Sequence, residues 1–374
     1  QCSGISRLLK ILHSSKDTST QEGSRQTLAI LGYSAPVSSH GIKILSIDGG
    51  GTRGLVAIDM LRHLEEKTKC PVHELFDLVC GVSTGAIIAV LIGVHRLSLD
   101  AIERLYKEIS TLIFSQTTIK GTASLVWNNS YYDSDVWTEI LKIHMGETPM
   151  IETASKEETK KLCLVSTQAN SNWVKAFLFR NYNFPYRAAS HFNGCSSARL
   201  WEGVRASAAA PGYFSEFKLN DLILLDGGVM VNNPTAIALH EARNIWPDTP
   251  LQSVVSLGTG RYEPLIIEGD KSINWASRLR TIINSATDTE GVHTTLHDLL
   301  PGNVYFRLNP YLSEEITLDE TREDKLDCLK KDTSLYVRKN ESKLDEAVES
   351  LLRPKSLMDK TKDYVTLQKQ MYEL

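Results

Sequence analysis

The sequence predicts an α/β protein with a mainly parallel central sheet, because one pattern occurs twice. An apolar strand pattern at 42–47 runs into the glycine-rich segment 48–54, and apolar residues at helical spacing follow. The same order of strand, glycine turn and helix returns at 75–94. Such a repeat predicts βαβ units, whose strands lie parallel. With 374 residues, 42% of them hydrophobic, the chain is long enough to bury a large core.

The other predicted elements follow the same alternation. Further strands are expected at 162–167, 175–179, 222–225, 253–257 and 304–308. Helices are expected at 99–113, 134–145, 198–208 and 234–245, and Gly146 stands where a helix C-cap is expected. These elements fill the main body of the chain.

The segment 78–94 carries no charge and is almost long enough to cross a bilayer. It contains Gly81, Gly85 and Gly93, however, and it follows the strand, turn and helix pattern. We therefore expect a buried core element and not a membrane span.

We expect three parts in the chain: an N-terminal helical extension at 1–40, the main domain at 41–310, and a mostly helical C-terminal segment at 311–374. In the last part an apolar stripe at helical spacing is formed by Leu344, Ala347, Val348, Leu351 and Leu352. We expect this helix to pack on the main domain, and contact with a membrane or a partner is the alternative.

Composition narrows the classes of function and location. The formal net charge of −4 gives no general electrostatic reason to bind nucleic acid. Six scattered cysteines without a Cys-x-x-Cys pair fit reduced thiols in a reducing compartment. The chain begins with Gln1 and not with Met, so we expect a piece of a longer protein, with any targeting segment upstream.

The segment 81–85, Gly-Val-Ser-Thr-Gly, matches a nucleophile elbow. There a serine, here Ser83, lies on a sharp turn between strand and helix, and the small flanking residues Gly81 and Gly85 allow the turn. The following helix directs amide N–H groups toward developing negative charge. A glycine-rich helix start with an ordinary capping serine is the alternative interpretation.

The segment 48–54 predicts an anion-binding nest, because consecutive glycines between strand and helix expose backbone N–H groups. Arg53 adds a positive charge beside them. The nest can serve a phosphate or an oxyanion, and the motif alone does not separate the two uses.

Asp226 follows the apolar strand 222–225 and precedes Gly227 and Gly228. A carboxylate at the carboxyl end of a strand stands where open α/β sheets place their active sites. Asp226 is therefore the best-placed base for Ser83, although an aspartate in an ordinary turn is the alternative.

Taken in order, these three segments and the segment 205–214, Arg-Ala-Ser-Ala-Ala-Ala-Pro-Gly-Tyr-Phe, resemble the motif set of patatin-like phospholipases. The resemblance covers about 41–308 and implies a three-layer α/β/α fold. It also implies a Ser-Asp dyad of Ser83 and Asp226, with an oxyanion hole from the N–H groups of Gly50 and Gly51 and from Arg53. The supporting motif glycines are Gly49, Gly54, Gly81, Gly85, Gly227 and Gly228.

The resemblance further implies hydrolysis of glycerophospholipid acyl esters, with lysophospholipid as a second substrate, at a membrane surface. It implies an intracellular, peripheral membrane enzyme of mitochondrial, peroxisomal or endoplasmic reticulum membranes. No calcium loop with alternating acidic ligands is present, so we expect no metal and no cofactor.

Three alternatives remain open. A non-catalytic lipid-binding module would use the same pocket. A kinase of the actin and sugar-kinase type would use 47–52 and 257–260 as phosphate loops, but it leaves the serine elbow unexplained. A histidine base would come from His240, His293 or His297; the last two have i, i+4 spacing but lack the metalloprotease glutamate.

Two residue groups are candidates for lipid contact. The aromatic side chains favour either a membrane interface or ordinary core packing: Phe114, Trp127, Tyr131, Tyr132 and Trp137. The arginines form either a headgroup-facing cluster or scattered surface charges: Arg180, Arg187, Arg199 and Arg205.

Overall fold

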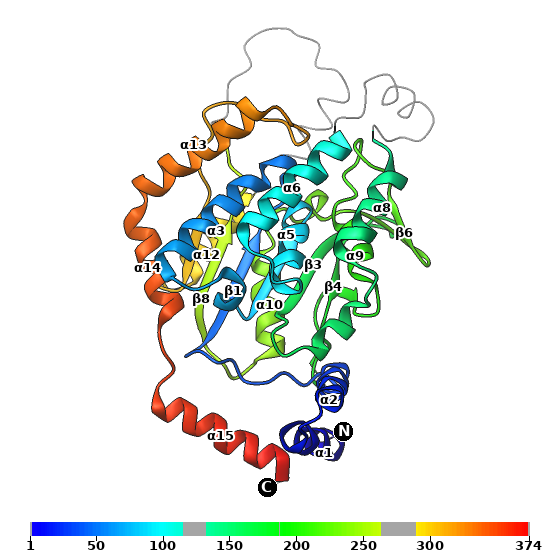
Figure 1. Ribbon diagram of the computed structural model, residues 1–374, viewed down its shortest axis with the longest axis vertical. Coiled ribbons are helices and arrows are strands. Elements are labelled where there is room, and N and C mark those ends of the chain that lie inside the picture. Colours follow the sequence, from blue (N-terminus) through cyan, green and yellow to red (C-terminus); the bar gives the residue numbers. More distant parts are fainter. Residues whose placement is uncertain (1, 115–131, 187, 263–288, 373–374) are drawn as a thin grey trace.

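The computed structural model describes residues 2–114, 132–186, 188–262 and 289–372. In these ranges the chain forms three layers, with helices on both faces of a central sheet (Figure 1). The order of strand, turn and helix expected at the start of the main domain is present. It runs from β1 (Ile42–Ile47) to α3 (Gly54–Thr68), and from β2 (Leu78–Val82) to α5 (Thr84–Gly93).

The described strands form one sheet in the order β5-β4-β3-β2-β1-β8-β9. Strands β9, β8, β1, β2 and β3 run parallel, and β4 is antiparallel to β3. The strands not yet placed are β3 (Lys161–Gln168), β4 (Lys175–Arg180), β5 (Asn193–Cys195), β8 (Leu251–Leu257) and β9 (Tyr305–Leu308). Parallel strands buried on both faces need near-continuous apolar runs, which explains Ile42–Ile47.

A hairpin of β6 (Phe217–Leu219) and β7 (Leu222–Asp226) joins the sheet beside β3. Strand β7 runs antiparallel to the end of β3 and pairs Asp226 with Ser166, while β2 pairs Val82 with Val165. The ends of β2 and β7 therefore meet next to the same strand. This topology brings Ser83 and Asp226 together although they are far apart in sequence.

The two faces of the sheet carry separate cores. One face is covered by α3, α5, α6 (Leu99–Phe114), α8 (Ser134–Met145) and α9 (Leu200–Ser207). The other is covered by α10 (Thr235–Ile245) and α12 (Thr289–Leu299) (Figure 1). Every residue of α5 is buried, which confirms that the uncharged segment 78–94 is a core element.

The C-terminal segment is helical, with α13 (Glu323–Lys339), α14 (Glu341–Leu352) and α15 (Leu357–Tyr372). The predicted stripe on α14 packs on the main domain, because Leu344, Ala347 and Leu351 are buried and α14 contacts α3 and β8. Helix α15 lies instead beside α1 (Cys2–Ser14), which packs on α2 (Thr18–Ile30) (Figure 1). The domain boundaries at 40 and 310 stay predictions.

Most predicted elements lie within a few residues of their expected positions. The strand expected from 75 begins only at Leu78, because Val72–Leu75 forms the short helix α4. The short strands β5 and β6 and the helix α12 were not predicted. Gly146 does end α8, with φ of 86°, in a conformation that favours glycine.

Candidate active site

Ser83 stands at the elbow between β2 and α5 with φ of 54° and ψ of −119°. This backbone conformation is strained for a residue with a side chain. It is held by tight packing on both sides, since a Cβ on Gly81 would lie 2.2 Å from the Gly85 carbonyl oxygen. A Cβ on Gly85 would lie 2.3 Å from the carbonyl oxygen of Ile47. The glycines of the motif therefore let β1, β2 and α5 approach closely enough to form the elbow.

Asp226 lies close enough to Ser83 for the serine hydroxyl to favour the ionised form of the carboxyl group. Its Oδ1 accepts the Gly228 N–H at 2.7 Å. Burial raises the pKa of Asp226 to about 6, and the Ser83 hydroxyl and the Gly228 N–H oppose that rise. The carboxylate is thus ionised at neutral pH but basic enough to take a proton, as a general base requires.

The residues of the predicted oxyanion hole lie on the turn between β1 and α3. In the described part of the chain we find no protein acceptor for the N–H groups of Gly50 and Gly51, whereas the Thr52 N–H donates to Leu318. Arg53 stays beside them, with Nε 3.4 Å from the Gly50 carbonyl oxygen and its guanidinium over the Tyr262 ring. Two free N–H groups and a cation are what an oxyanion needs.

The remaining motif glycines occupy close approaches of the same kind. A Cβ on any of them would lie between 2.2 and 3.0 Å from its nearest neighbour. These residues are Gly49, Gly54, Gly227 and Gly228. A larger residue at any of these positions would require the neighbouring groups to shift.

Asp48, the first residue of the glycine turn, does not face the reaction. Arg307 on β9 donates to both of its oxygens, at 2.9 and 2.6 Å. Burial raises the pKa of Asp48 to about 6, and the Arg307 guanidinium opposes this rise. The pair therefore fastens the turn to the sheet, and the sequence offered no signal for Arg307 because β9 is distant in the chain.

A segment after β9, which we call the strap (residues 312–322), also holds the glycine turn. The Leu318 carbonyl oxygen accepts the Thr52 N–H at 2.8 Å. Tyr106 reaches the turn from α6 and bonds both the Gly51 carbonyl oxygen and the Thr84 hydroxyl. Tyr106 thereby ties the glycine turn to the residue after the nucleophile. Neither contact could be read from local sequence.

The segment 205–214 supports both members of the dyad. The Ser207 hydroxyl accepts the Ser83 N–H at 2.9 Å and donates to the Val165 carbonyl oxygen at 2.6 Å. The Ala209 carbonyl oxygen accepts the Asp226 N–H at 2.9 Å. This fourth motif is thus a backbone support for the dyad.

A cavity of about 580 Å³ opens beside the dyad. Ser83, Asp226, Gly50, Gly51 and Arg53 all line it. Most other lining residues are apolar or aromatic, among them Ile87, Ile109, Ile113, Phe114, Trp137 and Phe214. The volume and the walls suit an acyl chain.

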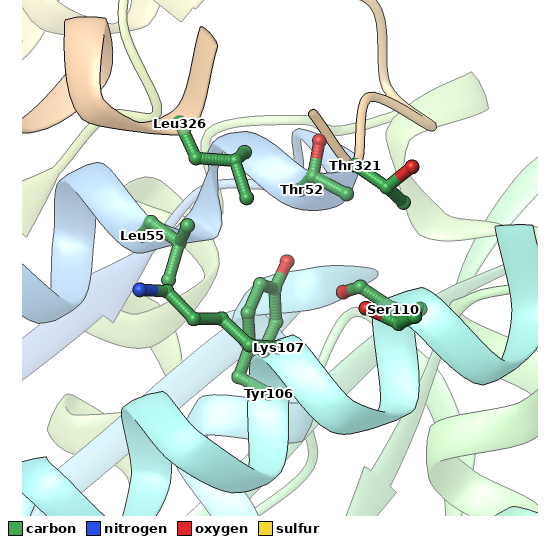
Figure 2. Close-up of a pocket in the computed structure, with 8 residues that line it drawn as sticks. Thr52, Leu55, Tyr106, Lys107, Ser110, Thr321 and Leu326 are labelled. Carbon is green, nitrogen blue, oxygen red and sulfur yellow. The ribbon is translucent and has the colours of Figure 1, made fainter. Parts of the chain in front are cut away.

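A second cavity, of only about 10 Å³, lies on the α6 side of the glycine turn (Figure 2). Thr52, Leu55, Lys107 and Thr321 line it. It has room for no more than about one water molecule. Tyr106 lines both cavities, so its ring is packed between the glycine turn and the acyl-sized space.

Of the two interpretations offered for the arginines, the headgroup-facing cluster does not form among the described residues, and two of these arginines are buried and not at the surface. Arg180 is buried on the α10 face of the sheet, where its Nε donates to Glu241 at 2.6 Å. Arg205 is buried on the opposite face, on α9, and donates to Ser215. Arg199 pairs with Glu147 at the surface, and Arg187 lies outside the described residues.

The aromatic residues gather mainly in the core. Tyr132 and Trp137 are buried, and their ring centroids lie 6.0 and 5.7 Å from that of Phe214. Phe114 packs edge-on against Tyr132 at 5.0 Å. Trp127 and Tyr131 lie outside the described residues.

The histidines have other partners. His240 accepts the His191 N–H at 3.1 Å, and the ring of His293 lies 3.2 Å from the Tyr305 hydroxyl. The ring centroids of His293 and His297 are 5.7 Å apart. Among the described residues, they do not join a third His, Cys, Asp or Glu in a group that could hold a metal ion. Of the described residues that line the 580 Å³ cavity, none is a histidine.

The serine at a strand–helix elbow, the neighbouring carboxylate and the nearby N–H groups match the arrangement expected of a serine hydrolase with a two-residue site. Residues 45–239 match the family model described as patatin-like phospholipase. The chain belongs to the patatin-like phospholipase family.

Two relatives show how far the likeness extends. The calcium-independent phospholipase A2-gamma of Oryctolagus cuniculus is 46% identical over 363 residues, which are 97% of this chain and 46% of the relative. Phospholipase A I of Arabidopsis thaliana is 30% identical over 340 residues, covering 76% of this chain and 26% of the relative. The chain thus spans about half the length of the gamma-type relatives it matches. Within the family, the residues of the four motifs most resemble those of this gamma type. The identity to relatives of that name confirms this resemblance.

Among solved structures, human GIVD cytosolic phospholipase A2 aligns with a TM-score of 0.45 and 10% sequence identity. The alignment covers 93% of this chain and 66% of the human chain. Over the described ranges, no helix combines the length and the apolar character that a membrane span requires.

Proposed function

We propose that the chain is the catalytic part of a phospholipase that hydrolyses acyl esters of glycerophospholipids, and of lysophospholipids, through Ser83 and Asp226. The observation that carries this proposal is the strained Ser83 beside a buried carboxylate, Asp226, with both residues at the wall of an apolar cavity. The family and the names of the relatives support the same reaction.

In the proposed reaction, the Ser83 hydroxyl oxygen attacks the ester carbonyl carbon while its proton passes to Asp226. The N–H groups of Gly50 and Gly51, with Arg53, stabilise the oxyanion. The intermediate expels the glycerol oxygen, which takes the proton, and an acyl-enzyme remains. Water then attacks this ester with Asp226 again as base, and free fatty acid leaves.

The proposed chemistry needs no metal, since a serine nucleophile and an oxyanion hole do the work that a metal does in other esterases. Hydrolysis should therefore continue in excess EDTA. Activity that returns only on adding calcium would contradict this part of the proposal.

We propose that the enzyme works at the surface of an intracellular membrane without spanning it. Its substrates lie in membranes, and apolar side chains are exposed on elements that flank the cavity, including Leu112 on α6 and Val136 on α8. The organelle (mitochondrion, peroxisome or endoplasmic reticulum) stays a prediction from the resemblance, and the oligomeric state is open.

Covalent labelling by a fluorophosphonate, read by mass spectrometry, tests the nucleophile. We expect label on Ser83 in the wild type and none on Ser83→Ala, whereas Ser19→Ala, at an exposed position, should label normally. Fatty-acid release from a phospholipid with different acyl chains at its two positions should follow the label. Absence of labelling in folded protein would refute the dyad.

The same variants test the alternatives. A lipid-binding module would bind liposomes equally with Ser83→Ala and show no ester cleavage in the wild type. The kinase interpretation is disfavoured because Thr259 packs into the glycine turn and donates to the Gly49 carbonyl oxygen at 2.7 Å. Thermal stabilisation by millimolar ATP with magnesium would revive it.

A further inference from the structure

The cavity contains a second carboxylate that the proposed reaction does not use. Asp319, on the strap, lines the same cavity as Ser83 and Asp226. Its Oδ2 accepts the Tyr132 hydroxyl at 2.8 Å, which fixes its position. Over the described ranges, no basic side chain forms an ion pair with Asp319. Within the ranges that the structure describes, this carboxylate at the cavity wall therefore has no salt-bridge partner.

Tyr132, whose hydroxyl contacts this carboxylate, belongs to a group of aromatic rings at the same cavity. The Tyr132 ring stacks on Tyr213 with centroids 6.2 Å apart and an interplanar angle of 16°. Tyr132 also packs edge-on against Phe114, at 5.0 Å. Tyr213 and Phe114 line the cavity. A carboxylate beside aromatic faces attracts cations, and quaternary ammonium groups are bound in such surroundings.

A positive charge lies on the neighbouring segment. The Thr52 N–H donates to the Leu318 carbonyl oxygen at 2.8 Å, so the glycine turn and the strap touch there. Arg53 follows Thr52 and Asp319 follows Leu318, and both line the cavity. Adjoining segments thus present one cation and one anion to the same space. A zwitterionic headgroup, a phosphate followed by an ammonium, has the complementary pair of charges.

We propose that Asp319 binds the ammonium group of zwitterionic phospholipids and makes the enzyme prefer them to phospholipids with an uncharged headgroup alcohol. Choline and ethanolamine lipids share this ammonium chemistry. The proposal rests on the proposed phospholipase function and adds the headgroup class to it. Asp319 acts here as a specificity residue and takes no part in the chemistry at Ser83.

The test uses dihexanoyl lipids with choline, ethanolamine or glycerol headgroups, each kept monomeric so that membrane binding does not enter. Asp319→Asn keeps the shape and removes the charge. We expect kcat/KM for the two ammonium lipids to fall about five- to tenfold, mainly through KM, with the glycerol lipid unchanged. Tyr132→Phe, which frees Asp319, should shift the ratio in the same direction by less.

Asp324→Asn is the matched control, since it removes the same charge from an exposed position in the first turn of α13. An equal loss on all three lipids, or no loss, would overturn the proposal. If kcat/KM fell for the choline lipid alone, the methyl groups of choline and not the shared ammonium charge would be recognised. This outcome would also contradict the proposal.

Hydrolysis of p-nitrophenyl butyrate separates the two proposals, because this ester has no headgroup. A wild type that cleaves neither ester nor lipid refutes the phospholipase function itself. If Asp319→Asn folds poorly, competition on the wild type decides: phosphocholine must inhibit ester cleavage more strongly than glycerol phosphate. Equal inhibition would refute the headgroup site alone.

Discussion

Asp48 and Asp226 have similar local sequences but different surroundings. Each stands at the carboxyl end of a strand, Asp48 before three glycines and Asp226 before two, and burial raises the pKa of each carboxyl to about 6. Asp48 is bound by both arms of the Arg307 guanidinium. The Asp226 carboxyl group instead accepts the Gly228 N–H and lies beside the Ser83 hydroxyl, and no basic side chain of the described residues forms an ion pair with it.

The difference shows that the partner, and not the pKa, decides what a buried carboxylate does. A charge locked in two short hydrogen bonds to arginine cannot accept a proton without breaking a buried ion pair. A carboxylate beside a hydroxyl can accept that hydroxyl's proton without breaking an ion pair. We therefore expect the Asp48 region to support the fold of the site and the Asp226 region to take part in the proposed chemistry.

The largest expected effect is on catalysis at the Asp226 end. Asp226→Asn keeps the size and the Gly228 hydrogen bond but removes the base, and we expect kcat to fall about 10³–10⁴-fold. Steady-state hydrolysis of a short-chain phospholipid measures it. Asp221→Asn, in the exposed β6–β7 turn, is the control and should keep full activity. Retention of most activity by Asp226→Asn would make another residue the base.

The second prediction concerns the buried ion pair between Asp48 and Arg307. Arg307→Met leaves a buried carboxylate without its cation, and we expect a loss of about 3–5 kcal/mol in the free energy of unfolding, measured in urea. Arg261→Met, which breaks a half-exposed pair with Glu290, should cost about 1 kcal/mol or less. Equal costs for both variants would show that the Asp48 pair is no special anchor.

The third prediction concerns stability at the catalytic carboxylate. The folded-state pKa of Asp226, about 6, lies above the ordinary aspartate value of 3.8, so folding disfavours its ionised form. Wild-type stability should fall as pH rises through this window. Asp226→Asn should therefore be more stable by about 2–3 kcal/mol at pH 8, and by nothing below pH about 3.5. Urea titrations at the two pH values measure this, and a gain that did not depend on pH would exclude the titration of Asp226 as its cause.

The smallest predicted effect is the pH dependence of the reaction. Asp226 must be ionised to act as base, so kcat/KM should fall on the acid side with an apparent pKa of about 6. At pH 5 the rate should be about tenfold below its plateau. A soluble ester isolates this limb from effects on membranes. A profile that is flat from pH 5 to pH 8 would contradict the assignment.

The sequence predicted those parts of the site that lie in contiguous motifs. Ser83, Gly50 and Gly51 lie in glycine-rich turns between a strand and a helix. Few functions require such a turn, so its sequence indicates a nucleophile elbow or an anion-binding nest. The residues that hold the turns were not predicted. Arg307, Tyr106 and Leu318 come from separate segments with no local signature, and they meet the glycine turn only through the fold.

The same reasoning applies to the fold. Long apolar strands such as Ile42–Ile47 can be predicted from their composition. Asn193–Cys195 has only three residues, all partly or fully exposed, and its composition does not indicate a strand. Such a strand exists only because β4 offers it an edge. Neither interpretation of Arg180, as a headgroup-facing or a scattered surface charge, holds, for a related reason: Arg180 pairs with Glu241 in the interior, and sequence alone shows no such pairing.

The strap limits where the protein can be truncated or cleaved by a protease without loss of a contact to the glycine turn. A recombinant fragment that ended at residue 310, or a protease that cleaved within 312–322, would keep Ser83 and Asp226 but remove the Leu318 carbonyl oxygen from Thr52. The glycine turn would then lose one wall while the nucleophile elbow stayed whole. Fragments chosen for crystallisation or inhibitor screening should therefore run at least through α13, beyond the end of the last strand.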